Sequence, residues 1–124
     1  MAEYLTDNVK LDHEKLDAYR MATELDRAVT GMARRVPRGH HWLADQALRA
    51  SGSVVLNLGE AMGREGADRA RALRIARGAA LEVDAALTLL RHRGACAETA
   101  RSEARGLNVR VVAMLTRLKD RAAD

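Results

Sequence analysis

Few residues in this chain have the types and spacing that catalysis or metal binding requires. No two of its four histidines stand four residues apart, as metal ligands on one helical face do: they are His13, His40, His41 and His92. Glu82 and Asp84 are too poorly placed for a catalytic pair of acids, because residues two apart point to different faces of a helix. "GREG" at 63–66 lacks the preceding strand and the lysine of a phosphate-binding loop. We therefore expect no metal, no cofactor and no enzymatic activity.

Cys96 is the single cysteine, so the chain forms no internal disulfide. It follows His92 and Arg93, which would lower its pKa, and a nucleophile is one interpretation. An incidental thiol is the interpretation we favour. The polar N-terminus is unlike a signal peptide and no apolar run approaches membrane length, so we expect a cytoplasmic protein without a membrane partner.

Cationic residues gather in two segments that contain no acid. The chain has 21 Lys and Arg against 17 Asp and Glu, a net charge of +4, which fits either a GC-rich genome or an anionic partner. The cationic residues of the two segments are Arg34, Arg35, Arg38, His40, His41, Arg91, His92 and Arg93. They are either favourable charges at helix C-termini or a rim that binds nucleic-acid phosphates. Trp42, beside them, would stack on a base or pack on the protein.

A second polar pattern runs through an otherwise apolar segment. Gln46, Arg49, Ser53, Asn57 and Glu60 step by three, four, four and three residues, which places them in one row along a helix. If such a row is buried, its members must be hydrogen-bonded.

Apolar residues at helical spacing predict four helices, at about 12–35, 41–62, 67–91 and 97–122. The apolar row of the first helix is Leu11, Ala18, Ala22, Leu25, Val29, Met32 and Val36. The row of the third is Leu73, Ala76, Ala80, Val83, Leu87 and Leu90, and that of the fourth is Ala100, Ala104, Leu107, Val111, Met114 and Leu118. The chain has no Phe and one Pro, and its apolar residues are mostly Leu, Val and Ala, which favours helices over strands. Short turns, including one at Pro37 and one capped by Gly94, join the helices. We therefore predict one all-α domain over 1–124, an antiparallel up-down-up-down four-helix bundle.

The second and third predicted helices should form a hairpin turning at Glu65 and Gly66. Antiparallel pairing then brings Arg49 beside Glu82, which we expect to form a largely buried ion pair, with Asn57 satisfying a polar group across the same seam. It also brings Gly52 beside Gly78, as points of close backbone approach. The second helix carries two adjacent apolar rows, more than one small bundle needs, which predicts a homo-oligomer.

These residues carry a family resemblance. The pattern Q-x-x-R-x-x-x-S-x-x-x-N-x-x-E at 46–60 is followed by I-A-R-G at 75–78, which includes Arg77, and by Glu82. Together with the P-R-G turn at 37–39, the pattern resembles the four-helix bundle proteins first noted in intervening sequences of 23S ribosomal RNA genes. The likeness covers about residues 15 to 120.

The resemblance implies a left-handed bundle that assembles as a homopentamer. It also implies similarity to the accessory variability determinant proteins of diversity-generating retroelements, which form a basic pentameric barrel that binds nucleic acid and a reverse transcriptase. Two hypotheses follow. One is a non-catalytic oligomer that binds RNA or DNA through its basic end, as accessory to a larger nucleic-acid enzyme; the other is a structural or protein-interaction module.

Overall fold

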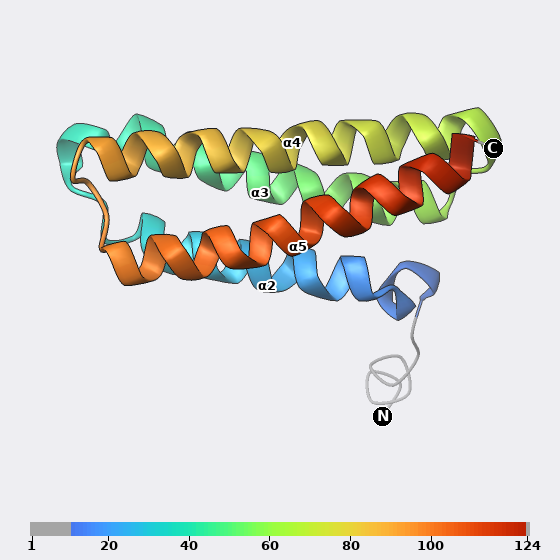
Figure 1. Ribbon diagram of the computed structural model, residues 1–124, viewed down its shortest axis with the longest axis horizontal. Helices are drawn as coiled ribbons and strands as arrows, with labels where there is room; N and C mark the ends of the chain where they lie inside the picture. Colours follow the sequence, from blue (N-terminus) through green and yellow to red (C-terminus); the bar gives the residue numbers. More distant parts are fainter. Residues whose placement is uncertain (1–10, 124) are drawn as a thin grey trace, which may run out of the picture.

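The computed structural model describes residues 11–123, and every regular element in this range is helical (Figure 1). Its elements are η1 (Asp12–Lys15), α2 (Asp17–Ala33), η2 (Arg38–His40), α3 (His41–Met62), α4 (Gly66–His92) and α5 (Glu98–Ala123). The two η elements are short 3-10 turns, and the four α-helices form a bundle. The all-α prediction is confirmed.

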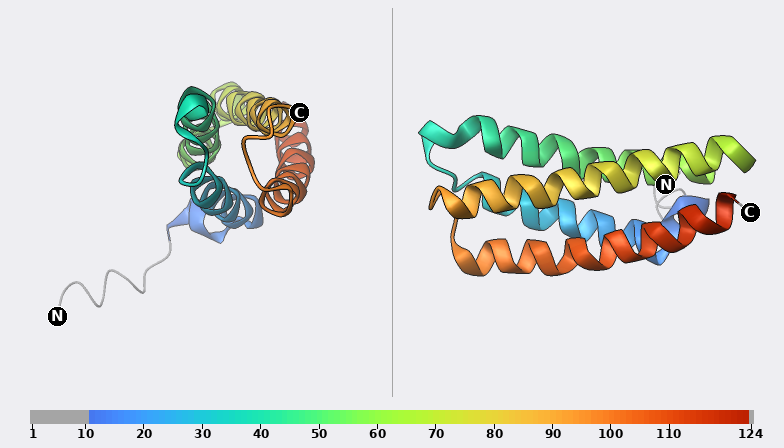
Figure 2. Two further views of the ribbon diagram at one scale, coloured as in Figure 1. Left: turned by 90° about the vertical axis from the view of Figure 1, so that its left-hand side faces the viewer. Right: turned by 45° about the horizontal axis from the view of Figure 1, so that its top comes forward.

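Each long helix packs against two others around a shared core (Figure 2). The packed pairs are α2–α3, α3–α4, α4–α5 and α2–α5. The α2–α3 connection and the α4–α5 connection lie at the same end of the bundle, whereas the α3–α4 turn lies at the other end (Figure 1). This arrangement brings together two segments that are far apart in the sequence.

The helix boundaries follow from local chemistry. Pro37 has no N–H and disfavours helical backbone at the residue before it, so α2 ends at Ala33, two residues before the predicted end. Gly94 has a φ of 60°, and its N–H donates to Arg91 O while the Ala95 N–H donates to Leu90 O. These two bonds form a Schellman motif, so the predicted glycine cap is confirmed.

The predicted first helix begins too early. Residues Asp12–Lys15 form a 3-10 turn, and Leu16 is extended with a ψ of 132°, so the α-helix starts only at Asp17. Leu11, placed in the apolar row of this helix, is exposed. The predicted bounds of the other helices agree with the structure to within one residue.

Small and branched apolar side chains fill the core. On α2 and α4 the predicted apolar rows are buried apart from Leu11. Alanines with no exposed surface lie among the leucines, including Ala22, Ala47, Ala76 and Ala80. Because their side chains are short, neighbouring helices pack closely without aromatic residues.

The core row of α5 differs from the predicted one. Leu107, Met114 and Leu118 are only half-buried, whereas Asn108 and Leu115 are buried. The Asn108 Nδ2 donates to Ala80 O at 2.8 Å and joins α5 to α4. A polar residue thus occupies a position that hydrophobic periodicity assigns to its apolar neighbour.

Three further side-chain bonds join neighbouring helices. Ser51 Oγ donates to Asp26 Oδ1 at 2.7 Å, linking α3 to α2. From α4, Arg77 Nε donates to Thr116 Oγ1 on α5 at 2.9 Å. Arg105 on α5 pairs with Asp84 on α4 at 3.1 Å. Because directional bonds have one register, these contacts fix how the helices slide along one another.

Candidate nucleic-acid interface

The two cationic segments lie at one end of the bundle. Residues 34–41 connect α2 to α3 and residues 91–93 end α4, and both connections sit at the same end in Figure 1. Arg93 places its guanidinium carbon 5.4 Å from the centroid of the ring of Trp42, the residue that directly follows the first segment. We call these residues, Arg34 to His41 and Arg91 to Arg93, the basic end.

One acid partly neutralises the basic end. Glu98, at the start of α5, pairs with Arg91 at 3.6 Å and with Arg101 at 2.7 Å. The hydrogen bond from Arg101 and the charges of Arg101 and Arg91 lower the pKa of Glu98, so this carboxylate stays ionised. The remaining arginines of the basic end form no ion pair with any residue that the structure describes: Arg34, Arg35, Arg38 and Arg93.

Helix dipoles explain only part of this charge. Arg91 and His92 lie in the last turn of α4 and Arg34 is the C-cap of α2, where cations are favourable. Arg38, however, lies in the 3-10 turn that leads directly into α3, whose first turn contains no acid. A cation there is repelled by the positive N-terminal end of the α3 helix dipole. The N-terminus of α3 therefore lies in a cationic surrounding that suits an anion.

Trp42 is exposed at this end. It is the second residue of α3, and 53% of its surface is accessible, whereas the next residue, Leu43, is buried in the core. Trp42 is therefore not a core residue, and about half of its surface faces solvent although Arg93 packs on its ring.

The polar row on α3 does not form the predicted buried network. Arg49 and Glu82 are both exposed and do not pair with each other, so the expectation of a largely buried pair is wrong. Asn57 Nδ2 donates to Ser53 O at 2.8 Å and to Ser53 Oγ at 3.1 Å, within its own helix. The row lies at the outer edge of the α3–α4 seam, where water satisfies exposed polar groups.

The other members of the row are also turned away from the core. Glu60 pairs with Arg64 at 3.2 Å, one helical turn further along, and Gln46 is exposed. Asn57, Glu60 and Arg71 line a small cavity of about 170 Å³ at the α3–α4 seam. Arg77 reaches α5 instead of α3.

Gly52 and Gly78 are not points of close approach. A methyl group added at either position would meet no atom within 4 Å. Both glycines lie toward the outside of the α3–α4 hairpin, so the prediction that two backbones meet there is wrong.

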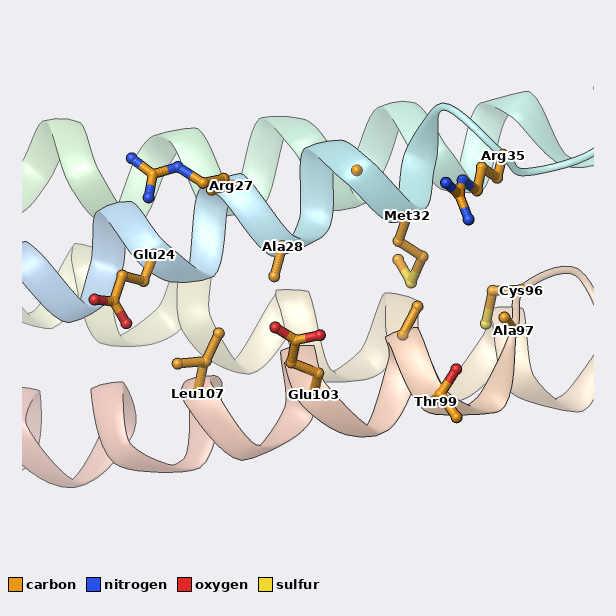
Figure 3. Close-up of a pocket in the computed structure, with 12 residues that line it drawn as sticks. Glu24, Arg27, Ala28, Met32, Arg35, Cys96, Ala97, Thr99, Glu103 and Leu107 are labelled. Carbon is orange, nitrogen blue, oxygen red and sulfur yellow. The ribbon is translucent and has the colours of Figure 1, made fainter.

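A groove lies between α2 and α5 (Figure 3). It encloses about 570 Å³ because Ala28, Gly31 and Ala100 leave space between the helices. Two acids, Glu24 and Glu103, share its rim with two arginines, Arg27 and Arg35 (Figure 3). With equal numbers of each charge, the groove does not extend the cationic surface of the basic end.

Cys96 lies at one end of this groove, and its side chain is half-buried. Burial raises the pKa of its thiol, and the opposing charge of Arg101 does not cancel the effect. A thiol with a raised pKa is mostly protonated at neutral pH and is a poor nucleophile. The structure therefore favours an incidental thiol over a reactive one.

Comparison with known families adds one match. The profile of a family described as 23S rRNA-intervening sequence protein matches residues 14–117. The chain belongs to this family. The match covers all four helices of the bundle in whole or in large part. A search of curated proteins found no match.

For this family member, the described residues give neither a membrane span nor a metal site. None of the helices between residues 11 and 123 is long and apolar enough to cross a bilayer. Across the same range, no three His, Cys, Asp or Glu side chains gather as metal ligands would.

Proposed function

We propose that this chain is a non-catalytic, oligomeric four-helix bundle that binds RNA and DNA through phosphates at its basic end, without reading sequence. The observation that carries the proposal is the meeting of two cationic segments, with four arginines that lack an ionic partner among the described residues. Arginine without a protein carboxylate is well suited to pair with phosphate.

The placement of Arg38 supports phosphate binding over helix capping. Backbone N–H groups at a helix N-terminus favour anions, and arginine in the same place is unfavourable unless an anion joins it. Arg38, in the turn entering α3, supplies that combination. The end consists of turns and helix termini, so it has no helix that could enter a groove and read base edges.

Self-association is the second part of the proposal, and a ring of five subunits is its expected form. The wide apolar surface of α3 does not support it, because those side chains are buried or half-buried inside a single bundle. The support comes from α4. The core side of α4 is apolar, and its outer side carries, with the charged residues Arg74 and Glu82 among them, exposed apolar and small residues at helical spacing: Ile75, Gly78, Leu81, Ala85 and Leu89.

We call these five residues the α4 stripe. Three large apolar side chains exposed at helical spacing, Ile75, Leu81 and Leu89, are typical of a surface that contacts another protein. Glycine and alanine in the stripe let a second helix approach closely, which suits a copy of the same bundle. Contact along this side leaves the basic end of each subunit uncovered.

The competing function is a structural or protein-interaction module, and the α4 stripe is the observation that favours it. In that case the stripe docks another protein and the basic end is a solvated surface. Both hypotheses are compatible with an accessory of a larger nucleic-acid enzyme, such as a reverse transcriptase, acting in the cytoplasm.

Nucleic-acid binding is tested by fluorescence anisotropy with labelled RNA and DNA at about 50 mM salt. We expect wild type to bind both, and Arg34→Ala/Arg35→Ala/Arg38→Ala to bind both weakly. The matched control, Arg110→Ala/Arg117→Ala/Arg121→Ala, removes the same charge from exposed positions on α5 and should bind like wild type. If wild type binds neither nucleic acid, the interaction-module hypothesis replaces this one.

The oligomer is tested by light scattering. Wild type should have a mass several times 13.6 kDa. Leu81→Glu places a charge in the α4 stripe and should produce monomers, whereas Ala113→Glu, an exposed position on α5, should not. A monomeric wild type would remove the self-association part of the proposal.

A further inference from the structure

We propose that Trp42 is a stacking surface for an unpaired base, so that the basic end binds single-stranded nucleic acid in preference to duplex. This inference rests on the proposed function, since it concerns the form of nucleic acid that the same end takes. It assigns a role to Trp42, the one large aromatic side chain that is exposed among residues 11–123.

The Trp42 ring contacts Arg93 and is partly open to solvent. Trp42 projects from the first turn of α3, immediately before Leu43 and Ala44, which are buried and anchor the backbone. Arg93, from the end of α4, lies over the ring at 5.4 Å from its centroid. The indole is thus supported by the turn of a second helix while 53% of the residue's surface remains accessible.

The surroundings of the ring match the chemistry of a nucleotide. A base offers an apolar π-face, and the phosphate beside it carries the negative charge. Arg38 stands four residues before Trp42, and neither it nor Arg93 pairs with a described carboxylate. An exposed aromatic ring among unpaired guanidinium groups therefore presents partners for both halves of a nucleotide.

Stacking on Trp42 requires a base that is free. Bases inside a duplex already stack on their neighbours, and reaching one requires either flipping it out or entering a groove. The basic end has no element shaped to do either. Single strands expose their bases without this cost, so the ring adds affinity for single strands alone.

The experiment uses the protein's own fluorescence, because Trp42 is its only tryptophan. Wild type is titrated with a short single strand, a duplex of equal length and an abasic single strand, which keeps the phosphates but has no bases. Anisotropy of labelled strands measures binding independently. We expect only the single strand with bases to quench the emission of Trp42, and to bind more tightly than the abasic strand.

Substitution should separate stacking from charge. Trp42→Leu should weaken single-strand binding by about 5- to 150-fold, the usual contribution of one stacked base, and leave duplex and abasic binding unchanged. Trp42→Tyr keeps an aromatic face and should restore part of the loss. Val109→Ala removes a similarly exposed apolar side chain on α5 and should change nothing.

The outcomes distinguish this inference from the function on which it rests. If all three nucleic acids bind without quenching, and Trp42→Leu binds the single strand like wild type, stacking is refuted while phosphate binding stands. If none of them binds, the proposed function fails too. If Trp42→Leu lowers the mass of the assembly, the ring packs against another subunit, and the stacking role is refuted.

Discussion

Replacing Arg34, Arg35 and Arg38 by alanine should reduce the salt dependence of nucleic-acid binding. This reduction is a more specific sign of lost phosphate contacts than the loss of affinity itself. These three and Arg93 are the arginines of the basic end without an ionic partner among the described residues. Each phosphate neutralised on duplex DNA adds about 0.9 to the slope of log affinity against log salt, so four contacts give a slope of about −3.6. Binding should then weaken roughly 150-fold between about 50 mM and about 200 mM salt.

The triple alanine variant retains only Arg93 of these four. Its slope should be about −0.9, and the same change in salt should weaken binding only about 3- to 4-fold. If one strand spans several subunits of a ring, both slopes increase together and their ratio of about four is preserved.

The slope is measured by anisotropy titrations at several salt concentrations, with light scattering to check that the variant keeps its mass. The variant at Arg110, Arg117 and Arg121 has the same net charge and should keep the wild-type slope. An unchanged slope in the basic-end variant would refute the reasoning, and so would an equal fall in both variants, which would mean that only total charge matters.

Three further predictions concern stability, measured by urea unfolding. Because Arg101 lowers the pKa of Glu98, the ionised carboxylate stabilises the fold at neutral pH. This contribution disappears as the pH falls through the folded-state pKa of Glu98. Glu98→Gln should therefore be less stable than wild type at neutral pH and equally stable in acid. Gly94→Ala should cost about 1–2 kcal/mol because of its positive φ, whereas Gly106→Ala, in open space within α5, should stabilise by about 0.5–1 kcal/mol. If Gly94→Ala and Gly106→Ala were both destabilised, the helical backbone and open surroundings assigned to Gly106 would be contradicted. Arg49→Ala and Glu82→Ala should each cost less than about 1 kcal/mol, as for exposed charges, and a larger loss would mean that they are buried.

The sequence predicts helices well where apolar residues dominate one face. The rows on α2 and α4 are correct apart from Leu11 because core positions there are apolar and their neighbours are mostly polar. On α5 the apolar residues are spread over more than one face, so periodicity selects Leu107 where the core contains Asn108. A polar side chain that bonds to a neighbouring helix carries no signal in a hydrophobic pattern.

The candidate site was only partly predictable. A bundle of four helices joined by short turns places the two cationic segments at the same end, and the structure agrees. The pairing of Glu98 with Arg91 could not be predicted from the sequence, because it depends on the direction in which α5 begins after the turn. The register of a hairpin does not tell whether a seam position such as Arg49 faces the core or water, and Arg49 is exposed.

The positions of the basic end and the α4 stripe determine how charge would accumulate in an assembly. The stripe runs along the side of the bundle, whereas the basic end lies across its tip. Subunits joined side by side in a closed ring share one orientation relative to the ring axis, so all of their basic ends would face the same way. Each added subunit would then contribute to one surface the four arginines that lack an ionic partner among the described residues, and avidity would turn individually weak phosphate contacts into firm binding. A variant that disrupts the stripe, such as Leu81→Glu, should therefore weaken nucleic-acid binding although it alters no residue of the basic end.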